Sequence, residues 1–485
     1  MTTHESYAAV AETHSGVVFF VGDHAYKIKK PVAFGFLDFR SRETRHAICH
    51  REVELNRRLS PDVYLGVADI LGPDGNPLDH AVVMRRLPDE RRLVARLHEG
   101  GVEHDIEQIA RTLAAFHANA ARSSAIDACA SAGTMTRRWD ANALEIERFL
   151  GSVLDRAAHE RALMMATRYL AGRAALFADR IARGRACDGH GDLLAEDIFC
   201  LDDGPRILDC IEFDDTLRWG DVLADMAFLA MDLEDHGAGD LAVRLLDQYR
   251  QAAADAWPDS LCHHYIAERA HIRAKVACLR WEQGNPAGAH DARRLLSLAT
   301  SHLEAGRVHL VVVGGLPGTG KSTLASSLGE RLGAAVLRTD ELRGDIVPST
   351  GAAPYEHGRY RPDSTNAVYQ SLLERARLCL MQGESVVLDA TWRDPHWRDV
   401  ARALADEVSA DLHELLCQAP WPVMEARIAA RGAAGVDPSE ATIEVARAMA
   451  DSCPPWPSAT TINTTTDPTT AAAEAIEVVL GPEAA

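Results

Sequence analysis

The sequence has few positive charges for its length. Its 485 residues include 51 Lys and Arg against 71 Asp and Glu, which gives a formal net charge of −20 at pH 7. Because contacts with a phosphate backbone need clustered positive charge, this balance disfavours a nucleic-acid partner. Any anion must instead be held by a local arrangement of backbone and side-chain donors.

The sequence also lacks closely spaced cysteine pairs and long apolar segments. Its ten cysteines are scattered without CxxC spacing, which argues against a zinc site and a disulfide framework and favours a reducing cytoplasm. The first twenty residues lack a basic stretch followed by an apolar core, and no window approaches 18 consecutive apolar residues. We therefore expect neither secretion nor insertion into a membrane.

The periodicity of apolar residues changes along the chain. Residues 17–30 predict a hairpin and 42–59 a helix, and from Ile106 to about Glu304 the pattern is mainly helical. Two apolar runs between Ile198 and Phe213, separated by Asp-Asp-Gly-Pro, predict a second hairpin within the helical part. No internal repeat of 20 to 50 residues is visible.

After Gly306, expected strands and helices alternate, as in a parallel α/β sheet. At 485 residues with 47% hydrophobic content, the chain is too long for one ordinary core. We expect a first domain over 1–303, with lobes of about 1–87 and 88–303, and a second domain over 304–485.

One motif carries specific chemistry: Gly315 to Ser322 reads GLPGTGKS, which matches GxxxxGK[ST] directly after the apolar run Val308 to Val313. In such a loop the glycines let backbone N–H groups converge on phosphate oxygens, the lysine reaches the terminal phosphates and the serine hydroxyl ligates Mg²⁺. The preceding strand disfavours the alternative of a flexible glycine loop. The expected nucleotide-binding residues are Gly315, Pro317, Gly318, Thr319, Gly320, Lys321, Ser322 and Thr323.

Two further strands of this domain end in candidate site residues. Residues 335–338 predict a strand followed by Asp340, which is placed to accept the proton of a substrate hydroxyl, and by Arg343, which is placed to hold an anionic group. Residues 385–388 predict a strand that ends at Asp389. An aspartate that closes an apolar strand is typical of a Walker B element, which positions Mg²⁺.

Arg427 and Arg431 lie four apart on one face of an expected helix and could close over a triphosphate as a catalytic lid. The alternatives are solvated helix charges for this pair and a helix N-cap for Asp340. Trp392 and Trp397 follow Asp389 and are expected in packing more than in a substrate pocket. Residues 308–465 resemble the small P-loop kinases related to polynucleotide kinase and zeta-toxin-like phosphotransferases.

The first domain carries three separated elements of a phosphoryl-transfer site. Lys27 lies on the second strand of the first hairpin, and Glu52 on the following helix could orient it. His190-Gly191-Asp192 is followed by Asp197, and Asp209 comes at the end of the second hairpin. Phosphoryl transfer needs a carboxylate near the incoming hydroxyl, groups that hold Mg²⁺, and a lysine at the phosphates.

These elements resemble the aminoglycoside phosphotransferase-like kinases, whose loop reads H-G-D-x-x-x-x-N and precedes an I-D pair and G-D-P-x-x-D; here the last element is Gly220 to Asp225. The resemblance implies a catalytic Asp192, a Mg²⁺ ligand at Asp209 and a Lys27–Glu52 ion pair. It also implies an adenine-binding hinge at Met84-Arg85-Arg86, in which Met84 and Arg86 contact the nucleotide. Asp197 stands where the family has a metal-binding asparagine, and a carboxylate there can still bind Mg²⁺. Only Gly16 stands where the family has a glycine-rich loop.

Together the two halves resemble a family of two-domain bacterial proteins described as bifunctional aminoglycoside phosphotransferase and ATP-binding proteins. The implied fold combines α+β and α/β classes: a protein-kinase-like domain followed by a P-loop NTPase/kinase domain with a mostly parallel sheet. We expect an ATP- and Mg²⁺-dependent phosphotransferase for a hydroxylated small molecule, without a nucleic-acid or membrane partner. A nucleotide-binding sensor with a degenerate first domain and a toxin-like kinase stay open, as do the acceptor, GTP in place of ATP, and the oligomeric state.

Overall fold

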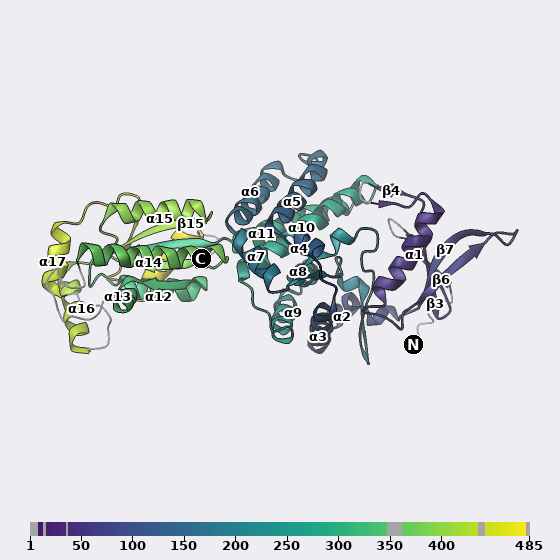
Figure 1. The fold of residues 1–485 in the computed structure, drawn as a ribbon, viewed down its shortest axis with the longest axis horizontal. Helices are drawn as coiled ribbons and strands as arrows, with labels where there is room; N and C mark the ends of the chain where they lie inside the picture. The colour runs from purple at the N-terminus through teal and green to yellow at the C-terminus, as the bar shows by residue number, and fades with distance from the viewer. Residues whose placement is uncertain (1–7, 13–15, 35–36, 347–360, 435–441, 482–485) are drawn as a thin grey trace. The chain divides into compact units, whose positions relative to one another are not determined.

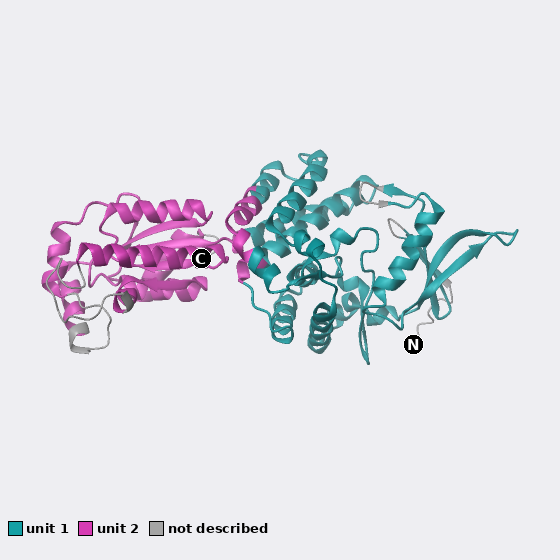
Figure 2. Ribbon diagram, viewed as in Figure 1, with its two compact units in different colours: residues 1–163, 177–257, 262–303 teal, residues 164–176, 258–261, 304–485 magenta. Residues whose placement is uncertain are grey.

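The structure is a computed structural model that describes residues 8–12, 16–34, 37–346, 361–434 and 442–481. The fold divides into two compact units (Figure 2). Unit 1 comprises residues 1–163, 177–257 and 262–303, and unit 2 comprises residues 164–176, 258–261 and 304–485. No helix in the described ranges is long and apolar enough to cross a membrane.

Unit 1 begins with an antiparallel sheet in the order β1-β2-β3-β7-β6, against which α1 packs (Figure 1). The first predicted hairpin is confirmed as β2 and β3, and Gly22 at the turn has a φ of 59°. Strands β1 and β6 were not expected from the sequence. The strands of this unit are β1 (Ala8–Glu12), β2 (Gly16–Val21), β3 (His24–Lys29), β4 (Ala33–Phe34), β5 (Leu37–Asp38), β6 (Tyr64–Leu71), β7 (Pro77–Arg85), β8 (Ala186–Asp188), β9 (Ile198–Leu201), β10 (Gly204–Ile207) and β11 (Trp219–Asp221).

The rest of this part of the chain is mainly helical, as the sequence predicts. The second predicted hairpin is confirmed as β9 and β10, and the chain leaves it toward Asp209, whose φ is 64°. The helices are α1 (Arg42–Asn56), α2 (Leu93–Glu99), α3 (Glu103–Asn119), α4 (Ser124–Cys129), α5 (Ala132–Ile146), α6 (Arg156–Gly172), α7 (Ala174–Ala182), α8 (Val222–Asp235), α9 (Gly239–Ala252), α10 (Asp259–Glu282) and α11 (Gly288–Ala305).

Unit 2 contains a five-stranded sheet in the order β13-β14-β12-β15-β16, and every pair of neighbours is parallel. The strands expected before Gly315, at 335–338 and at 385–388 are confirmed as β12, β13 and β14, whereas β15 was not predicted. The elements are β12 (His309–Gly314), α12 (Lys321–Leu332), β13 (Ala335–Arg338), α13 (Thr339–Ile346), α14 (Pro362–Met381), β14 (Val386–Asp389), α15 (Pro395–Glu407), β15 (Asp411–Gln418), α16 (Trp421–Ala434), α17 (Ile443–Asp451), β16 (Thr460–Asn463) and α18 (Pro468–Leu480). The predicted combination of fold classes is confirmed.

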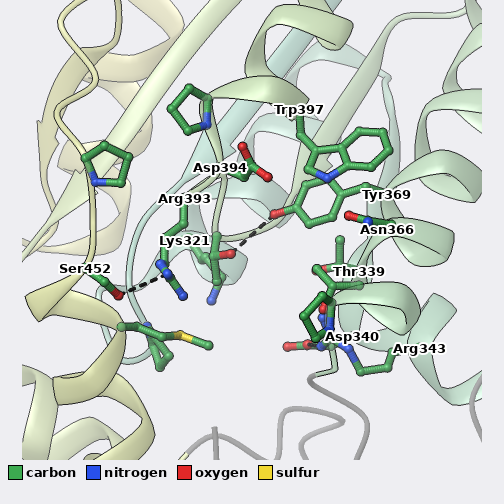
Figure 3. Close-up of a pocket in the computed structure, with 17 residues that line it drawn as sticks. Lys321, Thr339, Asp340, Arg343, Asn366, Tyr369, Arg393, Asp394, Trp397 and Ser452 are labelled. Atoms are coloured by element: carbon green, nitrogen blue, oxygen red, sulfur yellow. Dashed lines mark hydrogen bonds and ion pairs between the residues drawn. The ribbon is translucent and has the colours of Figure 1, made fainter. Parts of the chain in front are cut away.

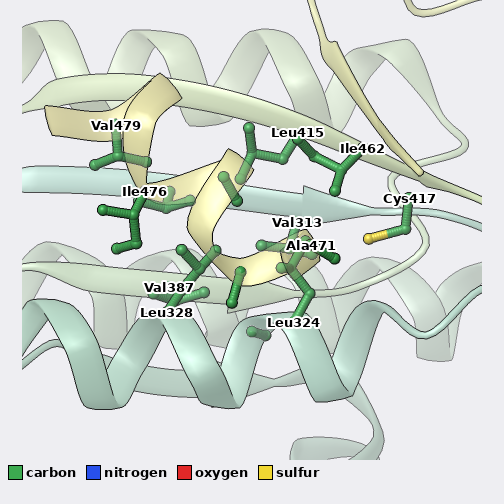
Figure 4. Packing of buried hydrophobic residues seen from close by; sticks show 14 residues of the cluster. Val313, Leu324, Leu328, Val387, Leu415, Cys417, Ile462, Ala471, Ile476 and Val479 are labelled. Carbon is green, nitrogen blue, oxygen red and sulfur yellow. The ribbon is translucent and has the colours of Figure 1, made fainter. Parts of the chain in front are cut away.

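One apolar cluster fixes the position of the P-loop in unit 2. Val313 on β12, Leu324 and Leu328 on α12, and Ile476 on α18 belong to it (Figure 4). Each of these side chains is at most 5% exposed. Because α12 and β12 flank the glycine loop and are both anchored in this cluster, burial of their apolar side chains holds the two ends of the loop in place.

Candidate active sites

The glycines of the P-loop are required by its backbone path. Gly315, Gly318 and Gly320 have φ angles of 146°, 84° and 88°, which side-chain-bearing residues rarely adopt. A Cβ atom on Gly315 would lie 2.9 Å from the carbonyl oxygen of Cys417, and one on Gly318 would lie 2.8 Å from that of Met424. Both close approaches and the backbone conformation therefore exclude larger residues.

Lys321 starts α12, is 8% exposed, and lines a cavity together with Pro317 (Figure 3). The loop before it is braced from two sides. The Thr319 hydroxyl donates to the carbonyl of Leu316 at 2.8 Å, and the Thr464 hydroxyl, just after β16, contacts the carbonyl of Thr319. These two contacts fix the path of the loop, whose N–H groups and lysine would bind an anion.

Asp389 and Ser322 form a pair suited to Mg²⁺. Asp389 ends β14 beside Val313 and is 4% exposed; its Oδ1 atom is buried without a hydrogen-bond partner. Burial raises the pKa of Asp389, against the charge of Lys321 and a hydrogen bond from Ser322. A carboxylate and a hydroxyl supply the oxygen ligands that Mg²⁺ takes, and its remaining positions go to phosphates and water. The residues present thus fit the ion.

Asp340 and Arg343 lie in the cavity that Lys321 also lines (Figure 3). Arg343 donates to Asp340 Oδ1 at 2.6 Å across one turn of α13. A carboxylate here faces the space where a hydroxyl would approach a phosphate held by the P-loop. The structure therefore brings together the predicted phosphate-binding and acceptor-binding residues of this unit.

The predicted lid arginines have separate outcomes. Arg427 lies beside the P-loop, where it donates to the carbonyl of Thr464 at 2.7 Å and reaches that of Gly318 at 3.5 Å. Arg431 is on the same helix, but its side chain lies outside the described part of the structure. Thr323, predicted to bind nucleotide, is exposed in the first turn of α12.

In unit 1 a network of buried charges surrounds Lys27. Its ammonium lies 3.0 Å from Glu52 Oε1 and also contacts Asp209. A second lysine, Lys29, lies 2.6 Å from Glu52 Oε2 and 2.5 Å from Glu212. Burial alone would raise the pKa of the fully buried Glu52, but the two lysines outweigh it and lower that pKa. Both lysines and Glu52 are therefore charged at neutral pH.

The loop from His190 to Asp192 is held by Asp225 at the start of α8. The Asp225 carboxylate accepts the N–H groups of His190 at 2.6 Å and of Gly191 at 2.9 Å, and His190 Nε2 donates to the carbonyl of Leu208 at 3.0 Å. Asp192 is left facing the cleft with its side chain 34% exposed and 3.8 Å from Arg273. Partial burial raises the pKa of Asp192 to about 6, against the charge of Arg273.

One cavity of unit 1 collects the predicted nucleotide and metal residues of this unit except Glu52, which is fully buried behind Lys27. Its walls include Lys27, Met84, Arg86, Asp192, Asp197 and Asp209. Burial and the neighbouring Asp209 raise the pKa of Asp197. The described residues contain no preformed group of three or more His, Cys, Asp or Glu side chains around one point. Asp197 and Asp209 offer carboxylate oxygens, which fit a Mg²⁺ ion whose remaining ligands are phosphates and water.

Several residues of these sites were missed from the sequence. Lys29 could have been found, because alternate residues of a strand share a face and it is two positions after Lys27. Glu212 and Arg273 gave no usable signal, since the fold brings them in from a distant loop and from α10. The sequence also gave no usable signal for Thr464 or Tyr369. The Tyr369 hydroxyl accepts the N–H of Trp392 at 3.0 Å.

The two tryptophans expected in packing have different surroundings. Trp392 is fully buried and donates to the carbonyl of Leu388 at 3.4 Å, as expected of a packing residue. Trp397 instead lines the cavity of unit 2 and stacks on Tyr369, with ring centroids 5.4 Å apart. Trp397 therefore packs, as expected, and also lines the cavity; a contact with substrate stays a prediction.

The chain is similar to several known proteins. A family model described as an AAA domain matches residues 310–456. Uncharacterized proteins of Mycobacterium tuberculosis and Mycobacterium bovis are 44% identical over 469 residues, covering 95% of this chain and 93% of theirs. A choline/ethanolamine kinase family protein from Mesorhizobium loti is 14% identical and covers 62% of this chain and 94% of its own, with a TM-score of 0.38. The Mycobacterium tuberculosis APS kinase CysC, in complex with AMPPNP and APS, is 22% identical and covers 36% of this chain and 98% of its own, with a TM-score of 0.28.

The likenesses to solved structures are distant, and the family assignment rests on the full-length relatives together with the motifs and strand orders described above. The relatives span both units of the chain. The chain belongs to their family of two-domain bacterial proteins, which joins an aminoglycoside phosphotransferase-like domain to a P-loop ATP-binding domain.

Proposed function

We propose that the chain is an ATP- and Mg²⁺-dependent phosphotransferase in which unit 2 transfers the γ-phosphate of ATP to a hydroxyl of a small molecule. The observation that carries this proposal is the shared cavity of Lys321 and Asp340. A phosphate-binding lysine and a carboxylate that can accept the hydroxyl proton lie on the walls of one space. This is the arrangement that in-line phosphoryl transfer requires.

In this proposal each site residue of unit 2 has a separate role. The N–H groups of the P-loop and Lys321 bind and orient the triphosphate, and Asp340 accepts the hydroxyl proton. Arg343 holds Asp340 in place through its 2.6 Å contact. Ser322 and Asp389 would hold Mg²⁺, which neutralises charge on the phosphates when bound. Arg427 keeps the loop closed on its ligand through the carbonyl groups of Gly318 and Thr464.

Unit 1 supplies a second nucleotide site in this proposal. Lys27 would orient the phosphates, and Met84 and Arg86 would flank the base. Asp197 and Asp209 would hold Mg²⁺, and Asp192 would accept the proton of the acceptor hydroxyl. The cavity of about 1360 Å³ that these residues line is large enough for a nucleotide and a small acceptor.

A second function, nucleotide sensing by unit 1 without phosphate transfer, is favoured by one observation. The ammonium of Lys27 contacts Asp209, the carboxylate that would bind Mg²⁺. Lys29 pairs with Glu52 as well, so both lysines are already held by carboxylates of unit 1 before any ligand binds. Such a site would bind ATP only at the cost of separating these pairs.

The test measures transfer of label from γ-labelled ATP to the compounds of a small-molecule extract. Lys321→Ala and Asp192→Asn are measured separately, with Arg331→Gln, an exposed residue of α12, as the control. We expect Lys321→Ala to lower transfer by about 10²-fold or more. If neither variant lowers transfer, both sites are wrongly assigned. If Lys321→Ala lowers transfer and Asp192→Asn leaves it unchanged, unit 1 is a sensor.

A further inference from the structure

The cavity of unit 2 contains a second arginine for which the proposed transfer has no role. Arg393 lies in the loop that follows β14, and its side chain reaches the cavity on the side of Lys321 (Figure 3). It donates to the Ser452 hydroxyl at 3.1 Å, next to α17. Segments far apart in the sequence thus place this guanidinium over the acceptor space.

Two guanidinium groups from different elements therefore line one small cavity, Arg343 from α13 and Arg393 from the loop after β14. The cavity also contains two carboxylates. That of Asp340 is bonded to Arg343, and that of Asp394 accepts the N–H of His396 as the cap of α15. Because a guanidinium presents its N–H donors in a planar fork, it matches a carboxylate or a phosphate group better than a neutral hydroxyl.

An aromatic wall forms another side of the cavity. The rings of Trp397 and Tyr369 are stacked with an interplanar angle of 17°, and both residues line the space. The Tyr369 hydroxyl accepts the N–H of Trp392, so a backbone contact positions its ring. Asn366 adds a side-chain amide beside it (Figure 3). A flat apolar face next to amide and hydroxyl groups suits a carbon chain that carries several hydroxyls.

We propose that the acceptor in unit 2 is a small anionic polyol, whose carboxylate or phosphate is bound by Arg343 and Arg393 and whose carbon chain packs on Trp397. This inference rests on the proposed function. One acceptor hydroxyl oxygen forms a bond to the γ-phosphorus, and the bond from that phosphorus to the β–γ bridging oxygen breaks. The hydroxyl proton passes to Asp340, and ADP leaves with the electron pair.

The first experiment asks whether the acceptor in the extract is an anion. The extract is passed over an anion-exchange resin at neutral pH, and both fractions are assayed with the full chain and γ-labelled ATP. We expect the acceptor to be retained and to be recovered by salt. If the flow-through keeps the acceptor, the inference is overturned while the proposed function stands; if neither fraction nor the starting extract accepts label, the proposed function itself fails.

The second experiment uses defined probes: aldonates of three to six carbons, the alditols of the same lengths, and their monophosphates. We expect transfer to at least one anionic series, and the preferred series distinguishes a carboxylate from a phosphate. Higher kcat/KM for every alditol than for the matched anions would overturn the inference.

The third experiment tests the arginines with the best anionic probe. Arg393→Gln should lower kcat/KM for that probe by about 10- to 100-fold, because the neutral amide loses the charge-assisted hydrogen bonds to the anionic group of the probe. Arg393→Lys should recover part of the loss, and the KM for ATP should be unchanged in both. A uniform loss for anionic and neutral probes, or an equal loss in the exposed control Arg331→Gln, would contradict a role in anion recognition.

Discussion

The two candidate sites use a lysine of the same burial in opposite surroundings. Lys27 and Lys321 are each 8% exposed. Lys27 is held by carboxylates that a second lysine also neutralises, whereas Lys321 begins a helix after a loop of glycines, and the nearby Asp389 keeps an oxygen without a hydrogen-bond partner. The comparison indicates that several carboxylates of unit 1 already hold Lys27, whereas Asp389 is the acidic group beside Lys321 that would share a metal ion with Ser322.

The largest expected effect concerns the candidate site of unit 2. Asp389→Asn should lower transfer by unit 2 by about 10³-fold, because loss of the metal contribution removes several kcal/mol of transition-state stabilisation. Burial raises the pKa of Asp389, so its charged form opposes folding at neutral pH, and the neutral amide should leave the melting temperature unchanged or higher. Transfer kinetics and calorimetry check both parts; a large fall in melting temperature would contradict them.

The next largest effect concerns the network of buried charges in unit 1. Lys29→Met leaves Glu52 and Glu212 buried without one of their counter-charges and should destabilise unit 1 by about 3–5 kcal/mol. Calorimetry should show one transition lowered and the other unchanged. Adding Glu212→Gln should restore part of the loss.

Lys30→Met is the matched control for that variant. Lys30 neighbours Lys29 in sequence, but its ion pair with Glu12 is exposed, with a 71% exposed carboxylate, and such pairs contribute about 0–1 kcal/mol. Equal shifts for Lys29→Met and Lys30→Met would show that the network of Lys27, Lys29 and Glu52 contributes no more than a surface pair.

A smaller effect concerns the pH dependence of unit 1. The pKa of Asp192 is raised to about 6 by burial, and a proton acceptor must be ionised, so transfer by unit 1 should fall as the pH drops through about 6. The charge of Arg273 opposes this upward shift, so Arg273→Gln should raise the pKa of Asp192 further. The fall of the transfer rate on the acid side of the pH–rate profile should then occur at higher pH. A pH–rate profile in a Lys321→Ala background isolates unit 1; a fall that stays at the same pH would contradict the assignment of Asp192.

The smallest expected effect concerns the brace of the P-loop. Thr464→Val removes the hydroxyl that contacts the carbonyls of Thr319 and of Gln418 while keeping the shape of the side chain. We expect the KM for ATP to rise by a few-fold, since a net hydrogen bond contributes about 1 kcal/mol. Thr465→Val, one residue on, is exposed and serves as the control. Equal KM values for the two variants would contradict the brace.

The sequence predicted most of the strands that end in site residues. The first hairpin predicted that Lys27 lies on a strand, and the apolar runs before Gly315 and Asp389 predicted buried parallel strands. These features are local, because they depend on side-chain periodicity and on backbone angles that glycine alone adopts readily. Strands β1, β6 and β15 were not predicted, because their apolar residues alternate less clearly and their pairing partners are distant in sequence.

The sequence by itself determined that a phosphate-binding loop follows a buried strand and that a lysine, a glutamate and three aspartates recur in the order of a kinase-like domain. Only the tertiary structure decided which charges meet. It placed Lys29 and Glu212 beside Lys27 and Glu52, and Arg393 over the acceptor cavity of unit 2. The reason is physical: a charged side chain is stabilised by the groups within a few ångströms of it, and chain folding rather than sequence spacing sets those distances.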